Sequence, residues 1–231
     1  MRNESAAPDP PLDLPLDLQS DYLEFRARLA GHRGLVAPLR EAVSQLARFG
    51  CLVHEHSGRL ALVARGDRPV LFTRHVLDSL NLLGLLSPPP GSVLDVGAGA
   101  GFPGIPLAIV WRETRVTLLE SQEKKCGFLE LAVRKLGLQN ARVVCARLES
   151  LGKGWEAKRH ACVVTRAVGD LPGLLAAAGP AALPGALWVY YLGAETKVER
   201  LLEQMGRAAA GAIVRRGAFG GRILMGEFPA P

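Results

Sequence analysis

The chain has 231 residues, of which 48% are hydrophobic and 22% are charged, and its net charge is +6 at pH 7. This length favours one main domain with a smaller attachment, and no run of 18 uncharged apolar residues offers a membrane-spanning helix. The first residues are acidic and proline-rich, unlike the basic and apolar parts of a signal peptide, so we expect a cytoplasmic protein.

The four cysteines agree with a reducing compartment. They lie far apart in the sequence and form no C-x-x-C pair. Cys145 and Cys162 occur in apolar runs that are typical of strands, and Cys51 and Cys126 are isolated. We therefore expect buried, reduced thiols and no metal site.

The first part of the chain is predicted to be a tail followed by helices. Residues 1–17 are rich in proline and acids, which is typical of a disordered tail. Residues 18–90 form a predicted helical extension, in which apolar residues recur at helical spacing before and after a glycine-containing break at 31–34. A further helix is expected from Phe72 to Leu86, ahead of three prolines.

Positive charge gathers in this extension. Between Tyr22 and Leu77 there are nine arginines and four acids. The planar guanidinium group suits phosphate contacts, so the extension is a candidate RNA-facing region. An ordinary solvated surface explains the charge almost equally well, because no aromatic side chains interleave with these arginines.

Residues 91–231 alternate strand-like and helical segments and are predicted to form the main domain. Such alternation indicates right-handed βαβ units and a parallel sheet with helices on both faces. The expected strands are 93–96, 116–119, 141–145, 161–165 and 186–192, followed by a hairpin of 213–215 and 222–228.

The segment 92–104, SVLDVGAGAGFPG, is the most informative part of the chain. Apolar residues lead to Asp95, and glycine then occupies every second position from Gly97 to Gly101 before a helical pattern begins. Glycine lets a ligand lie against bare backbone, and the N–H groups at the start of the next helix attract polar groups. This order predicts a binding site for a nucleotide-like cofactor.

Two cofactor classes compete for this loop. Gly99-x-Gly101-x-x-Gly104 formally satisfies the dinucleotide fingerprint, but there the first glycine follows the strand directly. Here Asp95 and Gly97 precede it, and an acid at that place suits a cofactor with a cationic amino group. The pattern Asp-x-Gly-x-Gly-x-Gly resembles the first motif of class I S-adenosylmethionine-dependent methyltransferases. That resemblance implies a Rossmann-like, seven-stranded, mostly parallel sheet.

A second acid lies at the spacing of a βαβ unit. The segment 114–120, TRVTLLE, is predicted to be a buried strand that ends in Glu120, 25 positions after Asp95, as expected for the second strand of such a unit. A carboxylate at that strand end can accept hydrogen bonds from both ribose hydroxyls of an adenosine. We therefore predict that Glu120 binds the ribose of the cofactor.

Three further segments point to one family of methyltransferases. The chain contains RHVLDSL at 74–80, the continuation GFPGIPLAI at 101–109 and TRA at 165–167. Together they resemble the RsmG (GidB) family, whose members methylate N7 of a guanine in small-subunit (16S) ribosomal RNA. The resemblance covers about residues 70–167. It implies S-adenosylmethionine as cofactor and ribosomal RNA, or the small ribosomal subunit, as partner.

The resemblance also implies the residues of the site. Leu148 and Glu149 would flank the adenine, and Arg166 would lie beside the cofactor and the reacting base. His75 is a second candidate for positioning the substrate. The predicted cofactor-binding residues are Asp95, Gly97, Gly99, Gly101, Phe102, Glu120, Leu148, Glu149 and Arg166.

The implied reaction needs no general base, because guanine N7 carries a lone pair and no proton. Catalysis would come from holding N7, the methyl group and sulfur in line, which can contribute about 7–11 kcal/mol. We therefore predict no catalytic side chain and no metal. Nothing in the sequence indicates an obligate interface, so we expect a monomer.

The sequence departs from the family pattern at three places. Ala61-Leu62-Val63 replaces Asn-Leu-Thr, Leu192 replaces a lysine near the end of the fifth strand, and no basic residues follow the hairpin. Each change removes a candidate RNA contact, and none touches the predicted cofactor pocket. Two alternatives therefore stay open: a class I methyltransferase for another RNA, a small molecule or a protein, and a catalytically silent RNA-binding homologue.

Overall fold

The computed structural model describes residues 14–32, 36–151, 159–166 and 169–229. Seven strands form one sheet in the order β3-β2-β1-β4-β5-β7-β6, in which β7 is antiparallel to both of its neighbours and the remaining pairs are parallel. The strands are β1 (Ser92–Val96), β2 (Arg115–Glu120), β3 (Ala141–Cys145), β4 (His160–Arg166), β5 (Ala182–Leu192), β6 (Ile213–Arg216) and β7 (Arg222–Glu227). The predicted Rossmann-like, mostly parallel sheet and its C-terminal hairpin are confirmed.

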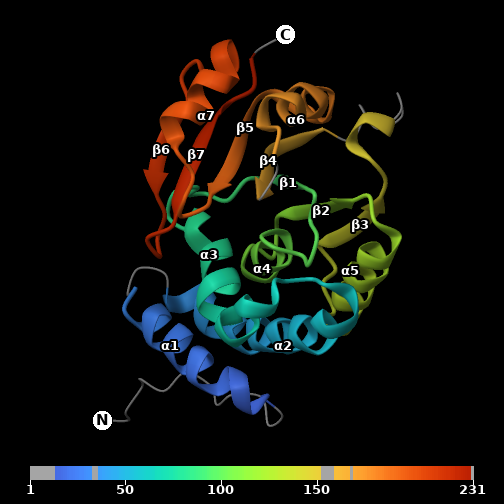
Figure 1. Cartoon of the computed structure of the whole chain (residues 1–231), viewed down its shortest axis with the longest axis vertical. Coiled ribbons are helices and arrows are strands. Elements are labelled where there is room, and N and C mark those ends of the chain that lie inside the picture. The colour runs from blue at the N-terminus through green and yellow to red at the C-terminus, as the bar shows by residue number, and fades with distance from the viewer. Residues whose placement is uncertain (1–13, 33–35, 152–158, 167–168, 230–231) are drawn as a thin grey trace.

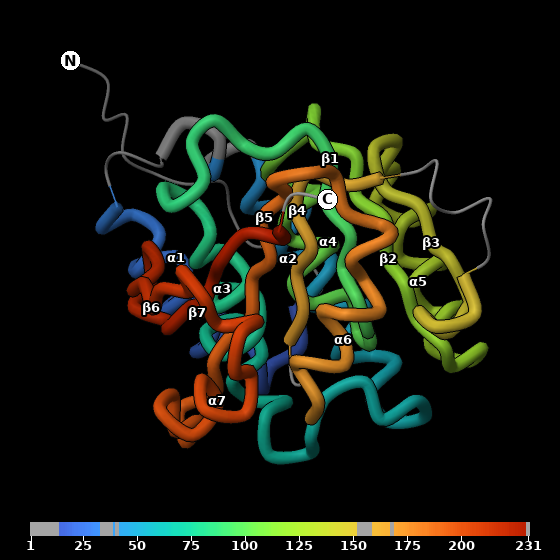
Figure 2. Tube along the Cα trace, turned by 90° about the horizontal axis from the view of Figure 1, so that it is seen from above, coloured from blue at the N-terminus to red at the C-terminus, as the bar shows by residue number. Residues whose placement is uncertain are grey.

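Helices cover both faces of this sheet (Figure 1). They are α1 (Gln19–Ala30), α2 (Val36–Leu60), α3 (Leu77–Ser79), α4 (Gly104–Val110), α5 (Glu123–Leu136), α6 (Leu171–Ala178) and α7 (Val198–Met205). On one face α2 packs across α4 and α5, and α1 packs on α2, whereas α6 and α7 belong to the opposite face. Seen from above, α1 lies beside the β6–β7 edge and α5 beside β3 (Figure 2).

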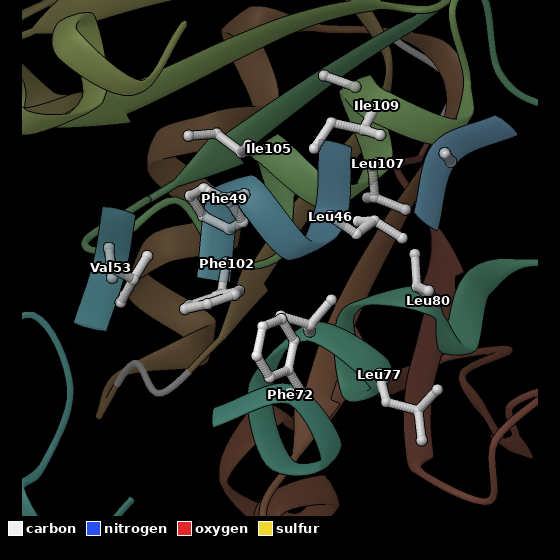
Figure 3. Close-up of a cluster of buried hydrophobic side chains, with 14 of the residues drawn as sticks. Leu46, Phe49, Val53, Phe72, Leu77, Leu80, Phe102, Ile105, Leu107 and Ile109 are labelled. Carbon is white, nitrogen blue, oxygen red and sulfur yellow. The ribbon is translucent and has the colours of Figure 1, made fainter. Parts of the chain in front are cut away.

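The N-terminal extension shares a hydrophobic core with the sheet. Phe25, Leu46 and Phe72 of the extension belong to one fully buried cluster together with Ile105 of α4 and Leu129 of α5. Figure 3 shows side chains of α2, of the segment 72–80 and of α4 gathered in this cluster. The extension therefore forms an additional layer over α4 and α5.

The predicted helix from Phe72 to Leu86 is wrong in its form and its end. The segment consists of a π-helical turn at 72–76, the short α3 and a 3-10 turn at 80–82. The carboxylate of Asp21 accepts hydrogen bonds from the backbone N–H groups of Phe72 and Thr73, which fixes the start. The helix ends before the prolines because Leu83 takes an extended conformation and Gly84 a φ of +83°.

Only the last residues of the predicted N-terminal tail are described in the structure. Residues 1–13 lie outside the described residues, while Leu14 is buried and Asp17 Oδ2 lies 2.9 Å from His54 Nε2.

Cys126 and Cys145 form a disulfide, so the prediction of reduced thiols is wrong for this pair. The two cysteines are 19 residues apart in the sequence, so no local pattern indicates the pair. The chain returns through α5 and brings their Cα atoms to 5.7 Å.

One buried amide joins the extension to the hairpin. Asn81, only 1% exposed, accepts hydrogen bonds through Oδ1 from the N–H groups of Phe219 and Gly221 at 2.9 and 3.1 Å. Its Nδ2 donates to the backbone oxygen and to Oδ1 of Asp78, both at 2.9 Å. A Cβ at Gly217 or Gly221 would overlap Asn81, so the turn at 217–221 needs glycine there.

Replacement of this amide should loosen the hairpin. In Asn81→Ala, a buried and a partly buried N–H group lose their acceptor, and we expect the free energy of unfolding to fall by about 1–3 kcal/mol. Urea unfolding measures the change. Gln139→Ala removes an exposed amide with a single long hydrogen bond and should be nearly neutral; equal losses in both variants would contradict this role of Asn81.

Candidate active site

The carboxyl ends of the parallel strands meet at one edge of the sheet, where ligands bind in folds of this type. Two cavities open along this edge. The loop pocket, of about 560 Å³, is lined by Gly97 of the glycine loop, Glu120 at the end of β2 and residues 146–149. The helical cleft, of about 780 Å³, lies between the segment 73–81 and the hairpin turn.

The glycine loop folds back against the end of β2. The N–H groups of Gly97 and Ala98 both donate to the carbonyl of Leu119, at 2.9 and 3.0 Å. Gly97 has a φ of +72°, and a Cβ placed on it would meet nothing within 4 Å. A side chain there would instead project from a strained backbone, so glycine keeps this part of the backbone open to a ligand.

Glu120 is fixed by three backbone donors. Its Oε2 accepts from Gly99 N at 2.9 Å, and its Oε1 accepts from Ser121 N and Gln122 N at 2.8 and 2.9 Å. The side chain is buried and lines the loop pocket. A carboxylate has about four lone-pair sites, so acceptor capacity remains for a ligand.

Leu148 and Glu149 lie across the same pocket. Both belong to the 3-10 turn at 148–150, which follows β3. The side chain of Leu148 is buried and gives the pocket an apolar wall, while Glu149 is exposed at the rim. The structure thus brings Gly97, Glu120, Leu148 and Glu149 together around one cavity.

Asp95 has a different environment from the one predicted. It is fully buried and lines neither cavity, and its Oδ2 accepts a hydrogen bond from Gly104 N at 2.8 Å. Its Oδ1 has no hydrogen-bond partner. That Asp95 faces a cationic amino group stays a prediction; in this structure its side chain points under the loop toward the start of α4. Burial raises the pKa of this carboxyl to about 7.

Gly101 and Phe102, also in the loop, face the buried side of it, as Asp95 does. A Cβ on Gly101 would come within 2.6 Å of the side chain of Ile105. Phe102 is only 3% exposed, and its ring packs on His75 at 5.3 Å and on Phe49 at 5.1 Å between centroids. These two residues fix the conformation of the loop through packing on its buried side, and neither of them lines the loop pocket.

His75 and Arg166 both pack against the ring of Phe102. His75 Nε2 lies 3.1 Å from Asp67 Oδ2, and burial, with Arg166 nearby, lowers the pKa of His75 to about 4. The imidazole is therefore neutral at pH 7. The guanidinium carbon of Arg166, at the end of β4, lies 5.1 Å from the centroid of the Phe102 ring, and its Nη1 lies 3.7 Å from Asp78 Oδ2.

The helical cleft is basic, and much of its wall was missed in the sequence. Five arginines line it, along with the carboxylates of Asp67 and Asp78. The arginines are Arg28, Arg74, Arg166, Arg216 and Arg222. Arg222 faces Leu192 across the β5–β7 pair, and its Nη2 donates to the carbonyls of Gly193, Ala194 and Thr196 at 2.9–3.1 Å. The hairpin pattern predicted strands, but only the register of β7 on β5 places Arg222 at the cleft.

Within the described residues, no helix is long and apolar enough to cross a membrane. The same residues contain no group of three or more His, Cys, Asp or Glu side chains arranged to hold a metal ion.

Comparison with known proteins gives one consistent family. Residues 42–215 match the family model described as rRNA small subunit methyltransferase G. Ribosomal RNA small subunit methyltransferase G of Stenotrophomonas maltophilia is 42% identical over 61% of this chain and 64% of its own length. The protein of the same name from Novosphingobium aromaticivorans is 34% identical over 82% of this chain and 84% of its own length.

A solved structure with a similar fold is a putative O-methyltransferase from Klebsiella pneumoniae. It is 16% identical, has a TM-score of 0.51, and the match covers 79% of this chain and 90% of that one.

The buried carboxyl of Asp95 makes a pH-dependent prediction. Its pKa rises from 3.8 to about 7 on folding, so the folded state favours the neutral acid. The loss of folding free energy caused by burying this carboxyl is absent at low pH, grows as the pH rises between these two values and is complete above pH 7. In Asp95→Asn the side chain cannot ionise, and the variant should gain about 2–3 kcal/mol relative to wild type between pH 5 and pH 8.

Urea unfolding of both proteins at several pH values gives this difference directly. Asp170→Asn is the matched control, because Asp170 is exposed and caps α6 through Gly173 N. A constant difference for Asp95→Asn would contradict the assignment.

Proposed function

The chain belongs to the rRNA small subunit methyltransferase G family, and we propose that it transfers a methyl group from S-adenosylmethionine to N7 of a guanine in small-subunit (16S) ribosomal RNA. The observation that carries this proposal is the position of the basic helical cleft beside the loop pocket on one edge of the sheet. A cofactor in the pocket and a base in the cleft would meet near the carboxyl ends of β1 and β4, where Arg166 lines the cleft.

The loop pocket suits S-adenosylmethionine in shape and in donors. The open face of Gly97 leaves room for the methionine part, and Glu120 keeps lone pairs for the ribose hydroxyls. Leu148 offers an apolar surface to the adenine, with Glu149 at the rim. When bound, the cofactor supplies an electrophilic methyl group on its sulfonium. Gly99, Gly101, Asp95 and Phe102 would act indirectly, by holding the loop in this shape.

The residues of the cleft suit methylation at N7 without a general base. N7 has no proton to remove, so the protein has only to orient the base and exclude water. The purine gains positive charge as the methyl group arrives, and nearby positive charge would oppose that change. Neutral His75 adds none, and Arg166 is paired with Asp78. Both residues are proposed to position the substrate.

The RNA backbone would bind the arginines of the cleft and of the extension. Arg28 and Arg74 come from residues 18–90, and Arg216 and Arg222 from the hairpin of the 91–231 domain. Arg222 stands opposite Leu192, where the family carries a lysine, and so offers a positive charge close to that place. We propose that the protein acts as a monomer, without a metal, on ribosomal subunits in the cytoplasm.

Labelled methyl transfer to small ribosomal subunits that lack the modification tests the proposal. A single 7-methylguanine, mapped by chemical cleavage of the RNA, would support it. Cofactor binding without transfer to the subunit would overturn it, and would favour a methyltransferase with another substrate or a silent RNA-binding homologue. RNA phosphate contacts make binding fall steeply with salt, which separates an RNA enzyme from one that acts on a small molecule.

Loss of the Glu120 charge should weaken cofactor binding. Glu120→Gln removes a charged acceptor of ribose hydrogen bonds, and we expect about 10- to 100-fold weaker binding of S-adenosylmethionine. Isothermal titration calorimetry measures this affinity. Glu123→Gln, at an exposed position on the first turn of α5, should bind as wild type does; an unchanged affinity in Glu120→Gln would remove the ribose assignment.

Arg222 should matter for RNA and not for the cofactor. In Arg222→Leu we expect weaker binding to small subunits, with the slope of log affinity against log salt reduced by about 1. Arg222→Lys keeps the charge and should recover most of the binding, whereas Arg134→Leu, on exposed α5 surface, should change nothing. An unchanged salt slope in Arg222→Leu would exclude a phosphate contact.

A further inference from the structure

The two carboxylates that line the helical cleft differ in how closely other side chains of the protein bind their oxygen atoms. Asp67 binds His75 through Oδ2 and Arg74 through Oδ1, both at 3.1 Å. Asp78 accepts one hydrogen bond from Asn81 at Oδ1, while its Oδ2 forms a longer ion pair with Arg166 at 3.7 Å. Its side chain is 31% exposed. Asp78 therefore has an accessible oxygen that a ligand in the cleft can use.

Asp78 and Arg166 are held side by side by separate parts of the fold. Asn81, itself fixed by the hairpin turn, donates to Asp78 and holds its carboxylate in place. Arg166 ends β4, and its guanidinium lies over the ring of Phe102. The wall of the cleft thus presents a positive donor beside a negative acceptor, next to the proposed place of the reacting base.

This order of donor and acceptor matches one edge of guanine. Guanine carries the acceptor O6 beside the donor N1–H, whereas adenine carries a donor amino group beside the acceptor N1. In guanine, O6 also neighbours N7 on its other side. A base whose O6 accepts from Arg166 and whose N1–H donates to Asp78 therefore leaves N7 free to receive a methyl group.

We propose that Asp78 and Arg166 form the base-recognition site of this enzyme, with Asp78 accepting the N1–H of the target guanine and Arg166 donating to O6. The inference rests on the proposed function and adds the residues that select the base. Adenine in the same position would set its amino group against Arg166 and its N1 lone pair against Asp78. Both contacts are repulsive, which is how a polar site rejects the wrong ligand.

A further hydrogen-bond donor would stabilise the charged form of Asp78. Burial raises the pKa of this carboxyl, because the charged form has lost hydrating water, and the interactions with Arg166 and Asn81 only partly offset the rise in pKa. An N1–H from the base would supply another hydrogen bond to the charge.

The test pairs a change in the enzyme with a change in the base. Small subunits are assembled with either guanine or 1-methylguanine at the mapped target nucleotide, because 1-methylguanine keeps N7 and O6 but lacks the N1–H. Methyl transfer is measured for wild type, for Asp78→Ala and for the matched control Asp67→Ala, which removes the other carboxylate of the cleft. Asp78→Asn repeats the measurement with a side chain of the same shape.

We expect wild type to methylate the 1-methylguanine substrate about 100-fold more slowly than the guanine substrate. In Asp78→Ala this penalty should shrink to a few-fold, as in a double-mutant cycle between groups in contact. Asp67→Ala should keep the full penalty, even if its rates are lower with both substrates. Affinity for S-adenosylmethionine, which Asp78 does not contact in this arrangement, confirms that each variant is folded.

Two results would overturn the inference, and they differ from each other. If wild type is active and 1-methylguanine slows methyl transfer equally in wild type, Asp78→Ala and Asp78→Asn, then Asp78 does not contact N1–H. The proposed function would stand in that case. No 7-methylguanine from wild type on the unmodified guanine subunit would overturn the proposed function itself, and the inference with it.

Discussion

The glycine loop is held between two carboxylates, and the site depends on this arrangement. Asp95 accepts from Gly104 N on the buried side of the loop, and Glu120 accepts from Gly99 N on the pocket side. A loop with so many glycines has high conformational entropy when unfolded, so fixed acceptors at both ends are needed to hold one shape. The burial of Asp95 opposes folding increasingly as the pH rises from 3.8 to about 7. The protein therefore gives up some stability to keep this loop in position.

The second half of the site is assembled from parts that are distant in the sequence. Asn81 in the extension binds the turn at 217–221, and Arg28 Nη2 donates to Phe219 O at 3.1 Å. The ends of the chain thus meet around the helical cleft, while residues 91–166 supply the glycine loop and the β-strand ends. The loop pocket and the helical cleft have separate walls, so a change in the cleft can leave the pocket as it is.

The sequence was sufficient for the features that follow from local pattern. The strand positions, the glycine loop, the acid at Glu120 and the hairpin are all visible in apolar periodicity and residue type. It was insufficient where the outcome depends on which way a side chain points or on register. Asp95 looked like a ligand for the cofactor, yet its strand position directs it under the loop, and Arg222 gained its place only through pairing with Leu192. The Cys126–Cys145 pair likewise depends on a tertiary approach.

Electrostatics places opposite demands on an enzyme that would methylate N7 of an RNA base. Binding the phosphate backbone favours many positive charges, whereas the methylated purine becomes positive and is destabilised by the same charges at close range. The cleft separates the two demands in space. Arg28 and Arg216 are exposed and Arg222 is half-buried where the extension and the hairpin line the cleft, while near Phe102 the histidine is neutral and Arg166 faces Asp78. The charge that a base would meet beside Phe102 is therefore close to balanced, and in the proposed arrangement the Asp78 carboxylate would both select the base and compensate its charge.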